Sequence, residues 1–207
     1  MRRSLNLAAA AITTVVLAAC QPTTTPTPTT TDPSPTMAPP TPTYQCTPEA
    51  GGKESPCSQI DYEKMKAKDA LYTEAEAVYR EFFAENIRIS RAGGVTEPSQ
   101  IILNTTAGSV QKNVMEVFRD MARRGVRAKG QDPILTINRG HGLSREGSVV
   151  ALEVCADASG WSFYDADGLV SHGRPAQERV YFGRDHEQLK MIYTEGKWVT
   201  SCLPDSE

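Results

Sequence analysis

A carboxylate accompanied by tyrosine hydroxyls is the constellation in this sequence that most suggests general acid–base chemistry. Glu153 lies in the middle of an apolar run, Tyr79 on a predicted helix and Tyr181 on a predicted late strand. In such a set the carboxylate serves as base and a tyrosine as the opposing donor. Glu153 alternates with Leu152 and Val154, however, which places it on the solvent face of its strand. We therefore assign no catalytic residue and keep these three only as candidates.

Four cysteines, Cys46, Cys57, Cys155 and Cys202, remain once Cys20 is set aside. An even number in an exported chain favours disulfides, and four cysteines allow three pairings. We favour Cys46–Cys57, which closes a short loop containing Gly and Pro, and Cys155–Cys202, which would join two C-terminal strands. A zinc site is the rival interpretation. The sequence has no CxxC or HxxxH spacing, so structural disulfides are the better explanation.

Other patterns that could bind a metal or act as a nucleophile have simpler explanations. The run from Asp165 to Gly168 is similar to the start of a calcium loop, but position twelve is Ala176 and the flanks are predicted strands. Asp-Gly is ordinary hairpin-turn chemistry. The histidines at 141, 172 and 186 are scattered, and Ser144 and Ser171 have no triad spacing. We expect no metal and no cofactor.

The first 19 residues have the layout of a secretory signal peptide. Arg2 and Arg3 precede an apolar stretch at residues 5–19, and small residues precede Cys20. Fifteen helical residues reach about 22 Å, short of a hydrocarbon core of roughly 30 Å, so a permanent transmembrane helix is the weaker interpretation. An ordinary signal followed by a chance cysteine is the other alternative.

The sequence Leu17-Ala18-Ala19-Cys20 resembles the lipobox of bacterial lipoproteins. This resemblance implies cleavage after residue 19 and a diacylglyceryl thioether on Cys20, with two chains of the palmitate type, enough for stable anchoring. The protein would then be held on the extracytoplasmic face of the cell membrane. Residues 21–43 are mostly Thr and Pro and predict an extended spacer of about 70 Å at most. A bare spacer is the simpler interpretation, and glycosylation of its threonines is the alternative.

Without residues 1–19 the chain has 20 basic and 25 acidic side chains and no basic block. This balance argues against nucleic acid and against an anionic lipid surface as partners. Three segments are expected: a signal peptide at 1–19, the lipidated cysteine with linker and disulfide loop at 20–57, and a domain at 58–207 that is long enough to bury a core.

Helices are predicted before strands in the domain. The first spans residues 58–89 with Ser58 as N-cap and a break near Ala70. A linking segment at 95–106 precedes a second helix at 109–124, which ends at Gly125. The apolar faces of the two helices comprise Leu71, Ala75, Val78, Tyr79, Phe82 and Phe83, and Val110, Val114, Val117, Phe118 and Met121.

Period-two patterns follow and predict strands at 134–138, 148–156, 161–164, 169–170, 177–183, 189–194 and 197–202. Turns are expected at 165–168 and at Glu195-Gly196. Helices followed by consecutive hairpins indicate an α+β domain with helices on one face of an antiparallel sheet.

This order of elements resembles the NTF2-like (cystatin-like α+β cone) superfamily and its small actinobacterial lipoprotein members. The Thr/Pro spacer with Cys46 and Cys57, the helix at 71–83, the strand at 149–155, the turn at 165–168 and the segment 196–202 carry the resemblance. It implies a curved sheet around a pocket, and a Gly-x-Trp turn that starts the last strand. Some members of the superfamily are isomerases, dehydratases or cyclases, and many are non-catalytic.

We expect a non-catalytic module that binds a small apolar ligand or an envelope protein, since fold alone does not transfer function. The alternatives are an isomerase or dehydratase acting on a small apolar substrate, and a structural or phage-related surface factor. The sequence does not indicate the oligomeric state.

Overall fold

The computed structural model describes residues 43–48, 52–142 and 145–202. These described residues form one compact unit, so the disulfide hairpin belongs to the same unit as the helices and sheets. The predicted signal peptide, Cys20 and most of the Thr/Pro spacer lie outside the described residues.

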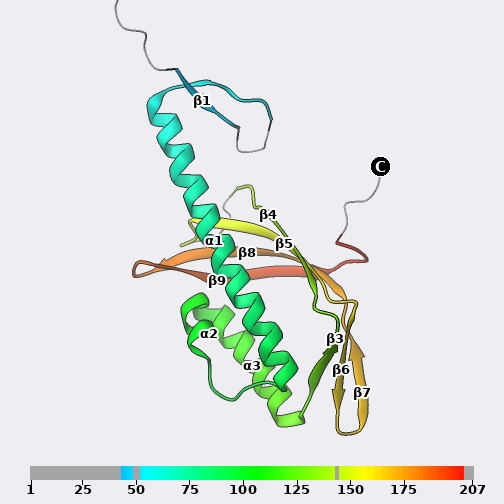
Figure 1. Cartoon of the computed structure of the whole chain (residues 1–207). Coiled ribbons are helices and arrows are strands. Elements are labelled where there is room, and N and C mark those ends of the chain that lie inside the picture. Colours follow the sequence, from blue (N-terminus) through cyan, green and yellow to red (C-terminus); the bar gives the residue numbers. More distant parts are fainter. Residues whose placement is uncertain (1–42, 49–51, 143–144, 203–207) are drawn as a thin grey trace, which may run out of the picture. The chain divides into compact units, whose positions relative to one another are not determined.

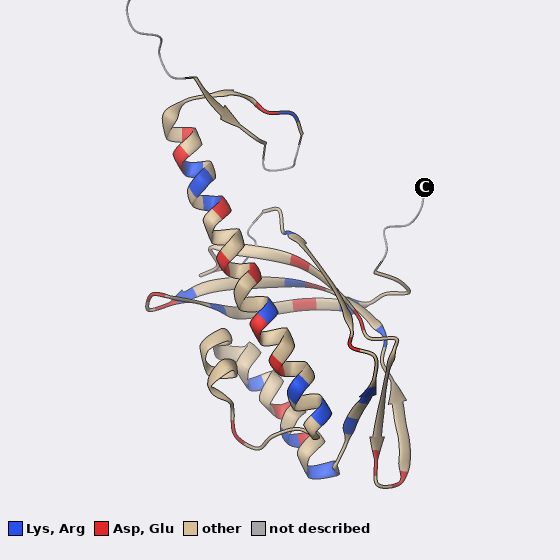
Figure 2. Cartoon of the chain, in the orientation of Figure 1, with Lys and Arg blue, Asp and Glu red and all other residues tan. Residues whose placement is uncertain are grey.

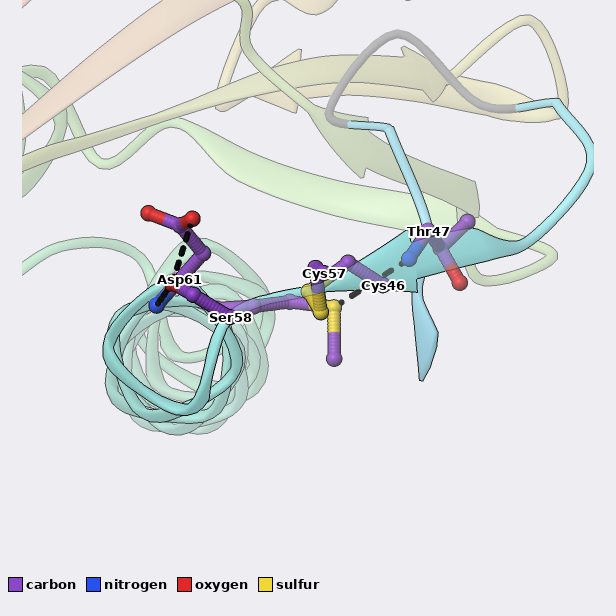
Figure 3. Close-up of a disulfide and its surroundings, with 6 residues drawn as sticks. Cys46, Thr47, Cys57, Ser58 and Asp61 are labelled. Atoms are coloured by element: carbon purple, nitrogen blue, oxygen red, sulfur yellow. Dashed lines mark hydrogen bonds between the residues drawn. A yellow bond between two sulfur atoms is a disulfide. The ribbon is translucent and has the colours of Figure 1, made fainter. Parts of the chain in front are cut away.

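A short hairpin precedes the first helix. Strands β1 (Tyr44–Cys46) and β2 (Ser55–Cys57) pair antiparallel, with Cys46 opposite Ser55. The predicted Cys46–Cys57 disulfide is confirmed, with the two Cα atoms 5.8 Å apart (Figure 3). The Thr47 amide contacts the sulfur of Met65 on the helix at 3.3 Å. The disulfide thus closes a hairpin that rests on the start of the first helix.

Helix α1 (Gln59–Ala92) extends the predicted helix by three residues and has no break near Ala70. The Ser58 hydroxyl accepts a hydrogen bond from the Asp61 amide, which confirms the predicted N-cap (Figure 3). At the other end Gly93 adopts a φ of 99° in the left-handed cap conformation. Acidic and basic residues are interspersed along α1 (Figure 2), so neither sign of charge dominates the exposed surface of the helix.

The segment predicted as a plain link contains a six-residue helix, α2 (Gln100–Thr105), capped by Ser99. Helix α3 (Gly108–Arg124) follows and ends at Gly125, as expected. Its buried face differs by one residue from the prediction, because Met115 is buried and Val117 is 58% exposed. Packing against the sheet decides which side of α3 is buried, and the apolar pattern of the sequence alone does not determine that side.

Two antiparallel sheets follow the helices (Figure 1). The four-stranded sheet has the order β4-β5-β8-β9 and consists of β4 (Ile134–Arg139), β5 (Val150–Asp157), β8 (Pro175–Asp185) and β9 (Gln188–Trp198). The three-stranded sheet has the order β3-β6-β7 and consists of β3 (Arg127–Gly130), β6 (Trp161–Asp165) and β7 (Gly168–His172). The α+β class is therefore confirmed. Strand β3 was not predicted.

The turn at 165–168 is confirmed, and the turn at Glu195-Gly196 is wrong. The Asp167 amide donates to the Asp165 carboxylate at 2.9 Å, and Gly168 has a φ of 125°. Strand β9, in contrast, runs unbroken through Glu195 and Gly196 to Trp198. The expected Gly-x-Trp turn before the last strand is therefore absent, and that last strand is the end of β9.

Helices α1 and α3 pack on one face of the four-stranded sheet, α1 against β5 and β9 and α3 against β9. Leu152 and Val154 of β5 and Val180 of β8 point into this core. We call this the helix-covered face, and the other side of the sheet the opposite face. The Cys155–Cys202 disulfide is confirmed, with Cα atoms 5.5 Å apart. It joins β5 to the segment after β9 rather than two strands, since β9 ends before Cys202.

Candidate functional site

A pocket of about 250 Å³ lies between the helices and the four-stranded sheet. We call it the central pocket. Its walls come from α1, α3, β5, β8 and β9, so elements distant in the sequence build it together. The lining residues are Tyr79, Phe82, Phe83, Asn86, Val110, Asn113, Val114, Val154, Ala156, Ala176, Glu178, Met191 and Thr194.

The helical wall follows directly from the spacing of α1. Tyr79, Phe82, Phe83 and Asn86 are separated by three or four residues and therefore lie on one side of the helix. The Tyr79 ring centroid is 6.0 Å from that of Phe82 and 6.2 Å from that of Phe83. The result is an aromatic wall with one hydroxyl and one side-chain amide.

Glu178 is the carboxylate of the central pocket. It belongs to the same face of β8 as Val180, and its partner in the register is Gly196 of β9. A Cβ atom at position 196 would lie 2.8 Å from Glu178 Cγ, so the glycine leaves the space that the glutamate side chain occupies. This close approach explains why Gly196 sits inside a strand rather than in a turn.

Burial raises the pKa of Glu178 above its ordinary value, because the apolar surroundings disfavour the charged carboxylate. Burial also raises the pKa of Tyr79, and the nearby Glu178 charge raises it further. The Tyr79 side chain is only 4% exposed. Among the residues that the structure describes, the Glu178 carboxylate accepts no hydrogen bond and forms no ion pair. Its polar atoms are thus available to a ligand.

A second pocket of about 420 Å³ adjoins the first and shares Phe83, Asn86 and Ala156 with it. We call it the lateral pocket. Trp161 and Trp198 line it, and they are the two tryptophans of the chain. Its remaining wall residues are Ile87, Pro133, Ala158, Phe163, Ser171, His172, Gly173 and Arg174.

Trp161 contributes an unused donor beside the lateral pocket. Its indole packs edge-on to Phe163, with ring centroids 5.7 Å apart. Within the described residues the buried Nε1–H of Trp161 has no acceptor, which is costly unless a water or ligand supplies one. Both pockets therefore combine apolar walls with a few polar groups, the usual make-up of a small-molecule site.

The predicted acid–base set is divided between the two faces of the sheet. Tyr79 lies in the central pocket, whereas Glu153 and Tyr181 lie on the opposite face. Glu153 is about one-third exposed and its Oε1 lies 3.4 Å from Arg179 Nε. Since its strand neighbours Leu152 and Val154 are buried in the core, Glu153 points away from the central pocket. The structure does not bring the three residues together.

Tyr181 belongs to a dense polar cluster on that opposite face. Its hydroxyl donates to the Glu195 carboxylate, which Arg145 approaches to 3.4 Å. Arg145 also stacks over Tyr193 at 3.7 Å, and Arg179 lies 5.5 Å from the Tyr181 ring. The Tyr181 hydrogen bond and the two arginines lower the pKa of Glu195. Each of these side chains has a partner, although the buried Nε–H of Arg179 has no hydrogen-bond acceptor among the described residues. The cluster therefore holds the sheet and its loops together.

Sequence reasoning missed Glu178, although the signal was present. Glu178, Val180 and Phe182 alternate along the predicted strand at 177–183, and two of the three are core residues. A carboxylate in phase with core positions is the pattern that marks a buried acid. Which face of the strand the helices would cover was the missing information.

A further depression of about 520 Å³ lies between the disulfide hairpin and the start of α1. Its lining includes the exposed side chains of Lys64, Lys68 and Asp61, together with the ion pair between Asp69 and Arg139 at 2.6 Å. Its charged groups are of both signs and largely hydrated. The central and lateral pockets, with their apolar walls, are the better site.

Among the described residues, no three or more His, Cys, Asp or Glu side chains lie close enough together to hold a metal ion. The same residues include no helix with both the length and the apolar character needed to cross a membrane.

No protein-family profile matches the chain, and no curated protein matches it. Two solved structures are similar in part. One is the intermembrane space region of the chloroplast protein ARC6, at 15% identity and a TM-score of 0.45, covering 61% of this chain and 95% of that one. The other is a de novo designed β-sheet protein, at 10% identity and a TM-score of 0.33, covering 64% and 97% respectively.

Proposed function

We propose that this chain is a lipid-anchored lipoprotein of the extracytoplasmic membrane face, and that its folded unit binds a small, largely apolar ligand. The observation that carries the binding proposal is the central pocket, where aromatic and aliphatic walls surround a carboxylate that has no partner among the described residues. The lipobox-like sequence ending at Cys20 and the Thr/Pro spacer after it support the anchor. Two disulfides in the folded unit fit an oxidising compartment.

We also propose that the folded unit is an NTF2-like cone. Its support is the packing of two helices on one face of an antiparallel sheet, with a pocket between the layers. An experimental structure in which the four-stranded sheet is flat and the pocket is filled by side chains would contradict this assignment.

The anchor is tested by changing Cys20. The wild-type chain expressed in a bacterium should enter the detergent phase on Triton X-114 partitioning, and mass spectrometry should find a diacylated N-terminal Cys20. Cys20→Ser should carry no lipid and should keep residues 1–19, as mass spectrometry of its N-terminus would show. A wild-type chain that stays aqueous, or whose Cys20 carries no lipid, would contradict the anchor.

Ligand binding is tested through the two tryptophans, because both line the lateral pocket. Small apolar compounds that enter the site should change the tryptophan emission in a saturable way. Ala156→Leu should abolish this response, since Ala156 forms a wall of both pockets. Thr136→Leu, at an exposed position on β4 opposite Cys155, is the matched control and should respond like the wild type. Equal responses of the two variants would place binding elsewhere and contradict the proposal.

An isomerase or dehydratase acting on a small apolar substrate is the second candidate. The observation that favours it is that Tyr79 and Glu178 line one apolar pocket, so a raised-pKa carboxylate and a hydroxyl donor share a site. The wild type should then exchange the α-protons of cyclohexanone in deuterated water faster than Glu178→Gln does, by proton NMR. Equal exchange rates would remove this candidate.

A further inference from the structure

Three other carboxylates of the folded unit each have an arginine partner, whereas Glu178 has no cationic partner among the described residues. Glu85 of α1 is only 4% exposed, yet Arg88 donates to both of its oxygens at 2.6 and 2.7 Å. Glu195 pairs with Arg145 of the segment before β5, and Glu153 pairs with Arg179 of the neighbouring strand β8. Burial of a carboxylate is costly unless a partner compensates its charge. Of these four carboxylates, Glu178 is the one without a cationic partner among the described residues, and it lines the central pocket.

The lining of the central pocket contains no Lys, Arg or His among the described residues. Its ionisable members are Glu178 and Tyr79, and its remaining polar groups are two asparagine amides and a threonine hydroxyl. Aromatic rings form the wall along α1, and ring faces attract cations. The pocket therefore has negative character without a positive counterpart.

We propose that the central pocket takes a small organic cation, an amphipathic amine whose ammonium group pairs with the Glu178 carboxylate while its apolar body packs against Phe82, Phe83 and Val114. The proposal rests on the binding function inferred above and names the chemical class of the ligand. The ammonium group supplies the cation that the chain provides to its other buried carboxylate. A phenyl or short alkyl body suits the size and the aromatic wall of the pocket.

A neutral ligand is the competing chemistry, since a protonated Glu178 could donate a hydrogen bond to a carbonyl or hydroxyl oxygen. The two cases differ in charge and are separable with three probes of nearly equal size. These are 2-phenylethylamine, 2-phenylethanol and phenylacetate, which present a cation, a neutral hydroxyl and an anion on the same aromatic body.

The test is calorimetric titration of residues 20–207 carrying Cys20→Ser and expressed without the leader, so that no acyl chain competes for the pocket. We expect 2-phenylethylamine to bind about 10- to 100-fold more tightly than 2-phenylethanol, the ratio that a charge-assisted hydrogen bond supplies. Phenylacetate should bind most weakly. Glu178→Gln should remove the preference for the amine, whereas Glu153→Gln, a carboxylate on the opposite face, should keep it.

The pH dependence of the wild type gives a second measurement that needs no variant of the pocket. Amine affinity should rise as the pH rises through the raised pKa of Glu178, while the affinity for 2-phenylethanol should fall or stay constant. Tyr79 on α1 is the other ionisable group that faces Glu178 within the pocket, and α3, β5 and β9 contribute neutral side chains there. Glu178 also lines a depression of about 400 Å³ whose other charged residues are Glu153, Arg179, Glu195 and Lys197.

Two outcomes would overturn the proposal in different ways. If the amine and the alcohol bind equally, or the alcohol binds better, the ligand class is wrong while the binding function stands. If none of the three probes binds and no apolar compound changes the tryptophan emission, the proposed ligand-binding function itself is contradicted.

Discussion

Two glutamate–tyrosine pairs lie on the two faces of the same strand pair, β8 and β9, and their surroundings are opposite. On the helix-covered face Glu178 and Tyr79 lie among apolar walls, and burial raises the pKa of both. On the opposite face Tyr181 donates to Glu195 and arginines stand nearby, so the pKa of Glu195 is lowered. The same two residue types thus produce one carboxylate without a partner among the described residues and one with a hydrogen bond and cations beside it.

The two carboxylates, Glu195 and Glu178, differ in whether the chain itself supplies a cation beside them. The opposite-face cluster obtains its cations from the chain, through Arg145 and Arg179. The helix-covered pair has none, because α1 and α3 present aromatic, aliphatic and amide side chains to it. Paired charges contribute to stability, whereas an unpaired buried carboxylate costs stability, and binding is the role that we propose for it. Each prediction below separates these two roles.

The largest effect is expected from the disulfide on the opposite face. The Cys155→Ser/Cys202→Ser variant should lose about 2–4 kcal/mol of unfolding free energy, because the bridge restricts the unfolded chain. The bond spans 47 residues. Urea denaturation of the variant and the wild type measures the loss. Cys155 points away from the central pocket, so probe binding should persist under native conditions. Loss of binding without loss of stability would contradict the division between the faces.

A side chain at position 196 should damage the pocket rather than the opposite face. Gly196→Val places its Cβ near Glu178 Cγ and near the Gln177 carbonyl oxygen, so the glutamate must move. Overpacking of this kind costs about 1–3 kcal/mol. Amine binding should be lost with it, as measured by calorimetry. Lys197→Val, at the next and exposed position of the same strand, is the control and should keep binding. Equal effects of the two would mean that Gly196 does not shape the pocket.

The sequence predicted correctly the features that depend on neighbouring residues, such as a helix cap. It did not predict which side chains lie on which face of the sheet. Ser58 caps α1 as predicted, and the favoured one of the three possible disulfide pairings is confirmed. Gly196 was predicted to lie in a turn but lies within β9. From the sequence alone, a glycine that leaves room for a side chain of the neighbouring strand cannot be distinguished from a glycine in a turn. Tyr79 and Tyr181 were grouped although the sheet separates them, and only tertiary packing decides that.

Removal of a single hydroxyl should affect the two tyrosines unequally. Tyr181→Phe takes away the donor to Glu195 and should lower the Tm by a few degrees. Tyr79→Phe should change the Tm little, because no hydrogen bond from its hydroxyl is present among the described residues and the ring keeps its packing. Differential scanning calorimetry compares them. A larger loss for Tyr79→Phe would show that its hydroxyl has a structural partner.

The smallest effect is expected in the pH dependence of stability, where the two glutamates have opposite signs. Glu178 has a folded pKa above the ordinary value of 4.5, so its ionisation destabilises the fold as the pH rises above 4.5. Glu178→Gln should match the wild type near pH 4 and become the more stable protein at neutral pH. Glu195 has a lowered pKa, so its contribution is complete above 4.5 and is lost as the pH falls below it.

Glu195→Gln should therefore be less stable than the wild type at neutral pH and approach it in acid. Urea unfolding of the three proteins at several pH values between 3 and 8 gives the differences, and subtraction of the wild type cancels the titration of other groups such as Glu85, whose pKa Arg88 lowers. If both variants differ from the wild type in unfolding free energy with the same sign at neutral pH, the carboxylates on the two faces of the sheet do not have opposite effects on stability. If the signs are opposite, the carboxylate that lowers stability is the one that lies in the pocket, and this cost is the one that a bound cation would offset.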